Sequence, residues 1–329
     1  MKEKMKQLLH LALSNDASDI HFVVKQHKLY VTMRTMYGLQ EMHSAAFDVS
    51  LFNYLKFLAN LDLANSTKSQ CGNFSYEYQN KTYQFRFSLL STIHKQTAVL
   101  RILYAPSNLD IYHLSHDDAQ TKSFLKWTNA RAGMVILCGP TGSGKTTTLH
   151  AILHEIAKKK QLRVVSLEDP VEILDDSYLQ LQVNEHVFTY EEGLRQLLRH
   201  DPDVIMLGEV RDANTARMLF RCALSGHMVF TTIHAKSCFE GIKRLAEFGI
   251  SHTELKGTLS AICAQRIFKA KQTEGRICIY EILEQKELYT YLSKKTVSNN
   301  YQDIFQKIKK AVQDGLIDQK EAAFDLATP

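Results

Sequence analysis

Residues 139–148 read Gly-Pro-Thr-Gly-Ser-Gly-Lys-Thr-Thr-Thr, and this stretch decides the fold of the second part of the chain. It contains G-x-x-x-x-G-K-[ST], the pattern of a phosphate-binding loop, in which glycines let backbone N–H groups curve around an anion. The pattern predicts that Lys145 reaches the β- and γ-phosphates of ATP and that the hydroxyl of Thr146 helps to hold Mg²⁺. The predicted nucleotide-binding residues are Gly139, Thr141, Gly142, Ser143, Gly144, Lys145, Thr146 and Thr147.

The residues on both sides of this loop support the same interpretation. Residues 134–138 form a short apolar run, which is typical of a buried parallel strand. After the loop, Leu149, Ile152 and Ile156 recur at helical spacing. A strand, a loop and a helix in this order distinguish a phosphate-binding loop from an accidental glycine-rich turn.

The bulk composition is that of an ordinary globular protein. The length of 329 residues suggests about two domains. No stretch approaches the roughly 20 apolar residues of a transmembrane helix, and the charged N-terminus lacks a signal-peptide core, so we expect a cytoplasmic protein. The net charge of +5 permits contact with an anionic membrane surface but does not indicate nucleic acid. Because the six cysteines include no C-x-x-C pair, we expect neither zinc nor a disulfide framework.

Two domains follow from the patterning. The N-terminal part predicts an α+β domain with a helix around residues 5–12 and a hairpin across 76–90 that turns at Asn80-Lys81. Turn-forming residues at 105–110 indicate a linker. The predicted divisions are an N-terminal domain at 1–104, a linker at 105–114 and an ATPase domain at 115–329.

The second domain alternates strands with helices. Such alternation predicts a parallel sheet with crossover helices, the RecA-like class of P-loop NTPase, here followed by an amphipathic helical tail after residue 284. The fold class is therefore α/β. The predicted strands of this sheet are 134–138, 162–167, 203–207 and 228–233.

Acidic residues follow two of these strands. The carboxyl ends of parallel strands face one ligand crevice, so the acids of residues 166–172 are placed to orient or deprotonate water. Glu168 is the first choice for this role and Glu172 a further candidate, the alternative being a solvated acidic loop. Glu209 follows the strand at 203–207, where a Walker B carboxylate belongs, and we expect it to share the Mg²⁺ site with Thr146.

Two histidines flank the strand at 228–233. His234 follows it at the same edge as the acids, so we expect it to sense the γ-phosphate or to position Glu209. His227 precedes the strand, and a functional and a structural role remain open for it.

These motifs together resemble the type II/type IV secretion-system ATPases, the motors of type IV pili, type II secretion and competence pseudopili. The match covers nearly the whole chain and includes the N-terminal Ala-Ser-Asp-Ile-His of residues 17–21. The signatures are the phosphate loop at 139–148, the Asp box at 167–172, the Walker B region at 198–212, the His box at 225–234, Ala-Gln-Arg-Ile at 264–267 and a Gly-Arg…Tyr-Glu segment at 275–283.

The resemblance implies a PAS-like N-terminal domain and a homo-hexameric ring whose nucleotide sites lie between that domain and the RecA-like domain. Arg86 and Arg101 match the family's paired arginine strands and are candidate arginine fingers, with surface salt bridges as the alternative. Arg266 has weaker support for a similar role.

Departures from the family pattern indicate which type of motor within the family this chain resembles. Only residues 268–274 separate Ala-Gln-Arg-Ile from Gly-Arg, which leaves no room for the four-cysteine zinc subdomain of many relatives. This compact form resembles the competence pseudopilus assembly ATPase of Gram-positive bacteria, and residues 86–94 and 245–250 also resemble assembly motors. Ser66 and Thr67 replace two family arginines, which puts a role of that loop in doubt.

The resemblance therefore implies an ATP hydrolase that powers pseudopilus assembly for DNA uptake. It would act at the cytoplasmic face of the membrane on a polytopic inner-membrane platform protein and on pseudopilins indirectly, without direct nucleic-acid contact and without zinc. The alternatives are a retraction or type II secretion motor of the same family, a RecA-like nucleic-acid translocase, and a nucleotide-gated scaffold with little hydrolysis.

Overall fold

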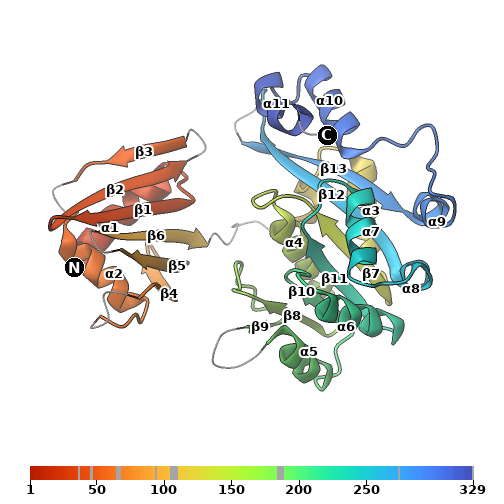
Figure 1. Ribbon diagram of the computed structural model, residues 1–329, viewed down its shortest axis with the longest axis horizontal. Helices are drawn as coiled ribbons and strands as arrows, with labels where there is room; N and C mark the ends of the chain where they lie inside the picture. The colour runs from red at the N-terminus through yellow and green to blue at the C-terminus, as the bar shows by residue number, and fades with distance from the viewer. Residues whose placement is uncertain are drawn as a thin grey trace. The chain divides into compact units, whose positions relative to one another are not determined.

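The computed structural model of this chain describes residues 1–35, 38–44, 47–63, 68–92, 95–103, 110–183, 189–272 and 275–327. The chain divides into two compact units, which we call unit 1 (Met1–Ala105) and unit 2 (Pro106–Pro329). Each unit has its own sheet and its own buried core (Figure 1).

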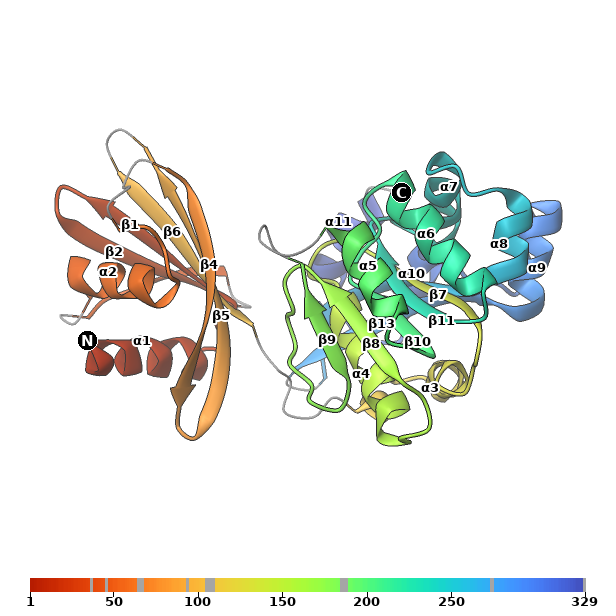
Figure 2. The same cartoon turned by 90° about the horizontal axis from the view of Figure 1, so that it is seen from below.

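Unit 1 is a six-stranded antiparallel sheet with two helices on one face (Figure 2). The strand order is β3-β2-β1-β6-β5-β4. The elements are α1 (Lys2–Ser14), β1 (Asp19–Lys25), β2 (Lys28–Thr35), β3 (Gly38–Met42), α2 (Val49–Leu58), β4 (Gln70–Tyr78), β5 (Lys81–Ser91) and β6 (Gln96–Leu103).

The core of unit 1 follows from the periodicity of its sequence. The apolar stripe of α1, with Met5 and Leu8, is fully buried. Phe52 of α2 packs edge-on against Phe87 of β5, with ring centroids 5.9 Å apart. The predicted hairpin is confirmed, since β4 and β5 are joined by Gln79 and Asn80, both at positive φ.

Unit 2 is built on a seven-stranded sheet in the order β13-β12-β7-β11-β10-β8-β9. The described pairings are parallel except that of β12 with β13. The strands are β7 (Gly133–Cys138), β8 (Val164–Glu168), β9 (Leu179–Gln182), β10 (Val204–Leu207), β11 (Met228–Ile233), β12 (Leu259–Lys269) and β13 (Arg276–Glu284).

The helices of unit 2 cover both faces of this sheet (Figure 2). The 3-10 turn at Ile111–His113 also belongs here, because Ile111 is buried in the core of unit 2 within the range expected to be a linker. The helices are α3 (Asp118–Trp127), α4 (Lys145–Lys158), α5 (Tyr190–Leu198), α6 (Ala213–Leu224), α7 (Cys238–Glu247), α8 (His252–Thr258), α9 (Gln285–Lys294), α10 (Ile304–Gln313) and α11 (Gln319–Ala327).

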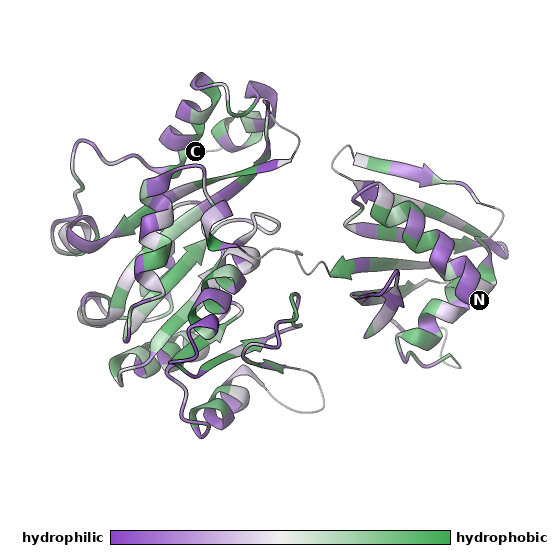
Figure 3. Cartoon of the chain, turned by 180° about the vertical axis from the view of Figure 1, so that it is seen from behind, coloured by the Kyte–Doolittle hydropathy of each residue, from purple (hydrophilic) through white to green (hydrophobic). Residues whose placement is uncertain are grey.

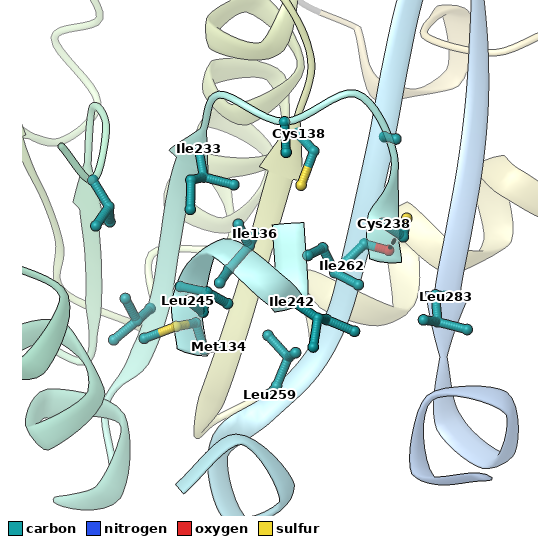
Figure 4. Packing of buried hydrophobic residues seen from close by; sticks show 14 of the residues in the cluster. Met134, Ile136, Cys138, Ile233, Cys238, Ile242, Leu245, Leu259, Ile262 and Leu283 are labelled. Atoms are coloured by element: carbon teal, nitrogen blue, oxygen red, sulfur yellow. Dashed lines mark hydrogen bonds between the residues drawn. The ribbon is translucent and has the colours of Figure 1, made fainter. Parts of the chain in front are cut away.

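Alternation along β7 explains how one strand serves both faces. Met134, Ile136 and Cys138 join the cluster that contains α5 to α8, where they lie beside residues of α7 (Figure 4). Val135 and Leu137 point the other way, into the cluster with α3 and α4. A strand buried on both faces must be apolar throughout, as the green central strands in Figure 3 show.

The predicted α/β fold with a RecA-like second part is confirmed, and the four predicted strands exist. The pattern did not predict β9, β12 or β13. Register within the sheet matters for the site, because Leu207 of β10 lies opposite both Leu167 of β8 and Thr231 of β11. The carboxyl ends of these strands therefore meet at one edge, where the loop after β7 also emerges.

Candidate active site

The phosphate loop joins β7 to α4 with a backbone that requires glycine. Gly142 and Gly144 have φ values of +79° and +85°, which L side chains rarely adopt. A Cβ on Gly144 would lie 2.9 Å from Nε2 of Gln265, and one on Gly139 would lie 2.7 Å from the Gln265 carbonyl oxygen. The loop thus packs directly on β12.

The start of α4 supplies donors for an anion. Its N-cap is Gly144, which has no side chain that could cap the helix, so the N–H groups of the first turn are left to bind an anion. Nζ of the buried Lys145 donates to the carbonyl oxygens of Gly139 (2.9 Å) and Pro140 (2.8 Å). Burial lowers the pKa of Lys145, and the charge of Glu209 acts in the opposite direction.

The side chains of the other loop residues differ in their exposure to solvent. Thr141 is exposed at the loop, whereas Thr146 and Thr147 are half-buried in the first turn of α4. The buried hydroxyl of Ser143 has no hydrogen-bond partner among the described residues. A phosphate oxygen would satisfy this orphaned hydroxyl, so the loop fits the nucleotide that its sequence predicts.

Glu168 is the last residue of β8, and it is only 2% exposed. Its Oε2 lies 3.0 Å from Nε2 of His150 on α4. Its Oε1 accepts hydrogen bonds from Oγ of Ser166 (2.7 Å) and Nε2 of Gln180 (3.4 Å). Glu168 is therefore a buried, fixed carboxylate, and the alternative of a solvated acidic loop does not apply to it.

Glu209 stands at the neighbouring strand end in a charged setting. Its Oε2 lies 2.9 Å from Nε2 of His234, and its Oε1 accepts a hydrogen bond from Nε of Arg211. Nη1 of Arg211 also lies 3.7 Å from Oδ2 of Asp169. The structure thus brings His234 to Glu209, one of the two roles expected for that histidine.

Among the described residues, no hydrogen bond joins His227, Arg266 or Glu172 to Glu168 or Glu209, although the charges of Arg266 and Glu172 both act on Lys145. Nδ1 of His227 lies 3.0 Å from the Cys222 carbonyl oxygen, at the amino end of β11, so it caps the end of α6 instead. Nε of the buried Arg266 donates to Oδ1 of Asp325 at 2.6 Å and ties β12 to α11, and its role toward nucleotide stays a prediction. Glu172 is exposed beyond β8.

Arg86 and Arg101 are directly opposite each other on β5 and β6 of unit 1. Nε of Arg101 lies 2.8 Å from Oδ1 of Asp19, the acid of the Ala-Ser-Asp-Ile-His stretch. Nε of Arg86 donates to Sγ of Cys71 at 3.3 Å. Their role toward nucleotide stays a prediction. The replaced positions 66 and 67 lie outside the described residues.

Sequence reasoning missed the polar residues that hold the predicted ones. Thr148 of α4, for example, hydrogen-bonds Oε1 of Gln265 and the hydroxyl of Tyr280, both at 3.1 Å. Polar side chains inside otherwise apolar, buried stretches were the available signal. The missed residues are Thr148, His150, Ser166, Tyr178, Gln180, Arg211, Gln265 and Tyr280.

The donor set also fits Mg²⁺ that arrives with a nucleotide. The Thr146 hydroxyl and the Glu209 carboxylate are hard oxygen ligands of the kind that Mg²⁺ prefers. Among the described residues, no group of three or more His, Cys, Asp or Glu is arranged to hold a metal ion. Mg²⁺ in NTPases usually keeps waters and binds substrate phosphates, so it needs no such protein cage.

Comparison with known proteins places this site in a family context. Residues 1–325 match the family model described as "Type II/IV secretion system protein". The chain is 34% identical to the competence protein ComGA of Bacillus subtilis (strain 168), over 94% of this chain and 92% of that protein.

In the described part of the chain, no helix is long and apolar enough to cross a bilayer.

Solved structures share the fold. The Legionella pneumophila ATPase DotB superposes with a TM-score of 0.81 at 21% identity, covering 99% of this chain and 95% of DotB. The pilus retraction motor PilT, solved with bound ADP, gives a TM-score of 0.78 at 23% identity and covers 99% of this chain and 97% of that one.

Proposed function

The chain belongs to the type II/IV secretion system protein family and is an ATP hydrolase, and we propose that it is the motor that assembles a competence pseudopilus for DNA uptake. One observation carries the proposal: a chain that matches a competence protein over 92% of that protein's length also holds a phosphate loop beside two anchored glutamates. The competence role of that relative supports assembly over retraction.

The chain's own residues suit hydrolysis at the γ-phosphate. Glu168 takes a proton from water as the water oxygen bonds to the γ-phosphorus and the bond to the bridging oxygen breaks, so that ADP leaves with the electron pair. Lys145 and the N–H groups of the first α4 turn offset the negative charge of the phosphates. Mg²⁺, held by Thr146 and Glu209, would neutralise charge on the β- and γ-oxygens.

The group around Glu209 suits a sensor of phosphate state. His234 and Arg211 both hold its carboxylate, and Arg211 reaches toward Asp169 after the neighbouring strand. Loss of the γ-phosphate changes the charge that this group faces, which favours a different arrangement of its hydrogen bonds. In this way hydrolysis is converted into motion of the chain.

The wider assembly is part of the same proposal. The motor works as a homo-hexamer at the cytoplasmic face of the membrane, where it drives a polytopic platform protein and, through it, the pseudopilins. Arg86 and Arg101 supply positive charge to the γ-phosphate when the ring closes on ATP. For Arg101 this requires release from Asp19, to which it is paired in this structure.

The test is Lys145→Ala in the full-length protein. We expect Mg-ATP hydrolysis and DNA uptake by transformation both to fall to background, with the protein level in cells unchanged. Unchanged ATPase activity in this variant would reject the proposed chemistry. A deletion strain that assembles pili but fails to disassemble them would instead identify a retraction motor.

A further inference from the structure

A buried chain of hydrogen bonds leads from Glu168 into the interior of unit 2. Nε2 of His150 lies 3.0 Å from Oε2 of Glu168, and Nδ1 of the same ring lies 2.5 Å from the hydroxyl of Tyr178. His150 is fully buried, and Tyr178 is 9% exposed. A fully buried imidazole with both nitrogens engaged has a defined orientation and a defined tautomer.

The direction of each hydrogen bond can be deduced. A carboxylate oxygen can only accept, so Nε2 of His150 carries the N–H that faces Oε2 of Glu168. Burial raises the pKa of Tyr178, so its hydroxyl keeps its proton and can donate it to the free Nδ1. The imidazole proton then sits on Nε2, where it donates to the carboxylate of Glu168. Protonation of the ring would leave an N–H at Nε2 as well.

Counting acceptor sites shows where water can bind. An ionised carboxylate has about four lone-pair sites. Oε1 of Glu168 accepts from Ser166 and Gln180, and Oε2 accepts from His150. The remaining site is on Oε2, the oxygen that His150 holds, so the imidazole and the attacking water share one oxygen atom.

We propose that His150 is a positioning residue for the general base: its Nε2–H holds Oε2 of the buried Glu168 and turns the free lone pair of that oxygen toward the attacking water. Tyr178 acts behind it by holding the imidazole in the tautomer that donates from Nε2. This resembles the logic of catalytic triads, in which a third group fixes the tautomer of a histidine. The inference rests on the proposed function, since it needs Glu168 as the base.

The surroundings of Glu168 make this donor necessary. Nearby titratable groups besides His150 and Tyr178 include Tyr190 of α5, whose pKa is raised by burial and by the charges of Asp169, Glu209 and Glu168 itself, while Arg211 lowers it. Ser166 and Gln180 bond only to Oε1 of the carboxylate, so among the described residues His150 is the donor that fixes Oε2. Removal of this N–H therefore lets Oε2 turn away from the attacking water.

The same helix offers a matched control. His154 lies one turn further along α4, and its Nδ1 contacts Oδ2 of Asp175 at 2.5 Å. Asp175 also accepts a hydrogen bond from Oγ of Ser177. This second histidine–carboxylate pair has the same chemistry as the first but no contact with Glu168 among the described residues, so His154→Gln tests helix packing alone.

The experiment measures kcat and KM for Mg-ATP hydrolysis by the full-length protein with His150→Phe, His150→Gln, Tyr178→Phe and His154→Gln. We expect His150→Phe to lower kcat about 10- to 100-fold with little change in KM, since general-base catalysis contributes about 10²- to 10⁴-fold. His150→Gln, whose amide N–H replaces the Nε2 donor, should recover most of kcat, and Tyr178→Phe should lower it a few-fold.

Other outcomes have distinct meanings. Wild-type kcat in His150→Phe would overturn the positioning role, as would equal losses of kcat in His150→Phe and His154→Gln, or a loss in His150→Gln as large as that in His150→Phe. If His150→Phe fails to fold, Tyr178→Phe decides, and an unchanged kcat in that variant would overturn the positioning role. No hydrolysis by the wild-type protein, or full activity of Glu168→Gln, would instead reject the proposed function.

Discussion

Two neighbouring strands of unit 2 each lead to a glutamate, and the two carboxylates are held in opposite ways. β8 and β10 pair in parallel, with Leu167 opposite Leu207. Glu168 is buried and hydrogen-bonded to side chains from α4, β8 and β9, whereas the side chain of Glu209 is 18% exposed and lies between Arg211 and His234.

This difference follows from position in the sheet. Glu168 ends β8, which lies between β10 and β9, so it is enclosed by neighbouring strands and by α4 beneath. Glu209 lies beyond the end of β10, after Gly208, where the chain has left the sheet. A buried carboxylate fixed by several hydrogen bonds suits a general base, and a more exposed one that pairs with an arginine suits a group that responds to metal and phosphate charge.

The strongest test of this comparison is Glu168→Gln. The amide has nearly the same shape but cannot accept a proton, so kcat should fall about 10²- to 10⁴-fold while ATP binding persists. Turnover and equilibrium binding of a fluorescent ATP analogue, measured on the same preparation, separate the two effects. Loss of binding together with turnover would assign Glu168 a structural role.

Glu209→Gln should have a smaller and different effect. Removing the charge weakens a Mg²⁺ ligand and leaves the base in place, so we expect kcat to fall about 10- to 100-fold with a higher Mg²⁺ requirement. A titration of Mg²⁺ at saturating ATP measures this. Equal Mg²⁺ dependence in the Glu168 and Glu209 variants would remove the distinction between the two glutamates.

Arg211→Lys sharpens the comparison further. Arg211 contacts Glu209 and also approaches Asp169, and a planar guanidinium bridges two carboxylates better than an ammonium does. We expect kcat to drop only a few-fold, on the order of 3- to 10-fold, because the positive charge remains. A matched Arg195→Lys change, in the exposed pair with Glu191, should leave steady-state turnover unchanged.

The smallest effect on turnover is expected for His227, at the amino end of β11 and away from the carboxyl ends that carry the site. His227 contacts the Cys222 carbonyl oxygen at the amino end of β11, far along the strand from His234. His227→Gln should change turnover less than 2-fold and lower the free energy of unfolding by about 1 kcal/mol or less, the value of one hydrogen bond. A large loss of kcat with normal thermal stability would contradict this assignment.

Local sequence was sufficient for the loop and for the strand ends. The glycine spacing at 139–148 and the apolar runs depend on residues close in the chain, so they predict elements and the edge at which Glu168, Glu209 and His234 meet. The pattern could not predict the partners of His227 and Arg266, because the partner that a side chain finds depends on packing.

The sequence by itself determined that this chain binds nucleotide, that unit 2 has a largely parallel sheet, and which acids follow its strands. Only the tertiary structure decided how those acids are held. His150 meets Glu168 across 18 positions and Thr148 meets Gln265 across 117, contacts that no periodic pattern encodes. Such contacts arise when α4 and β12 pack on the sheet, because buried polar groups must find partners wherever the fold brings them together.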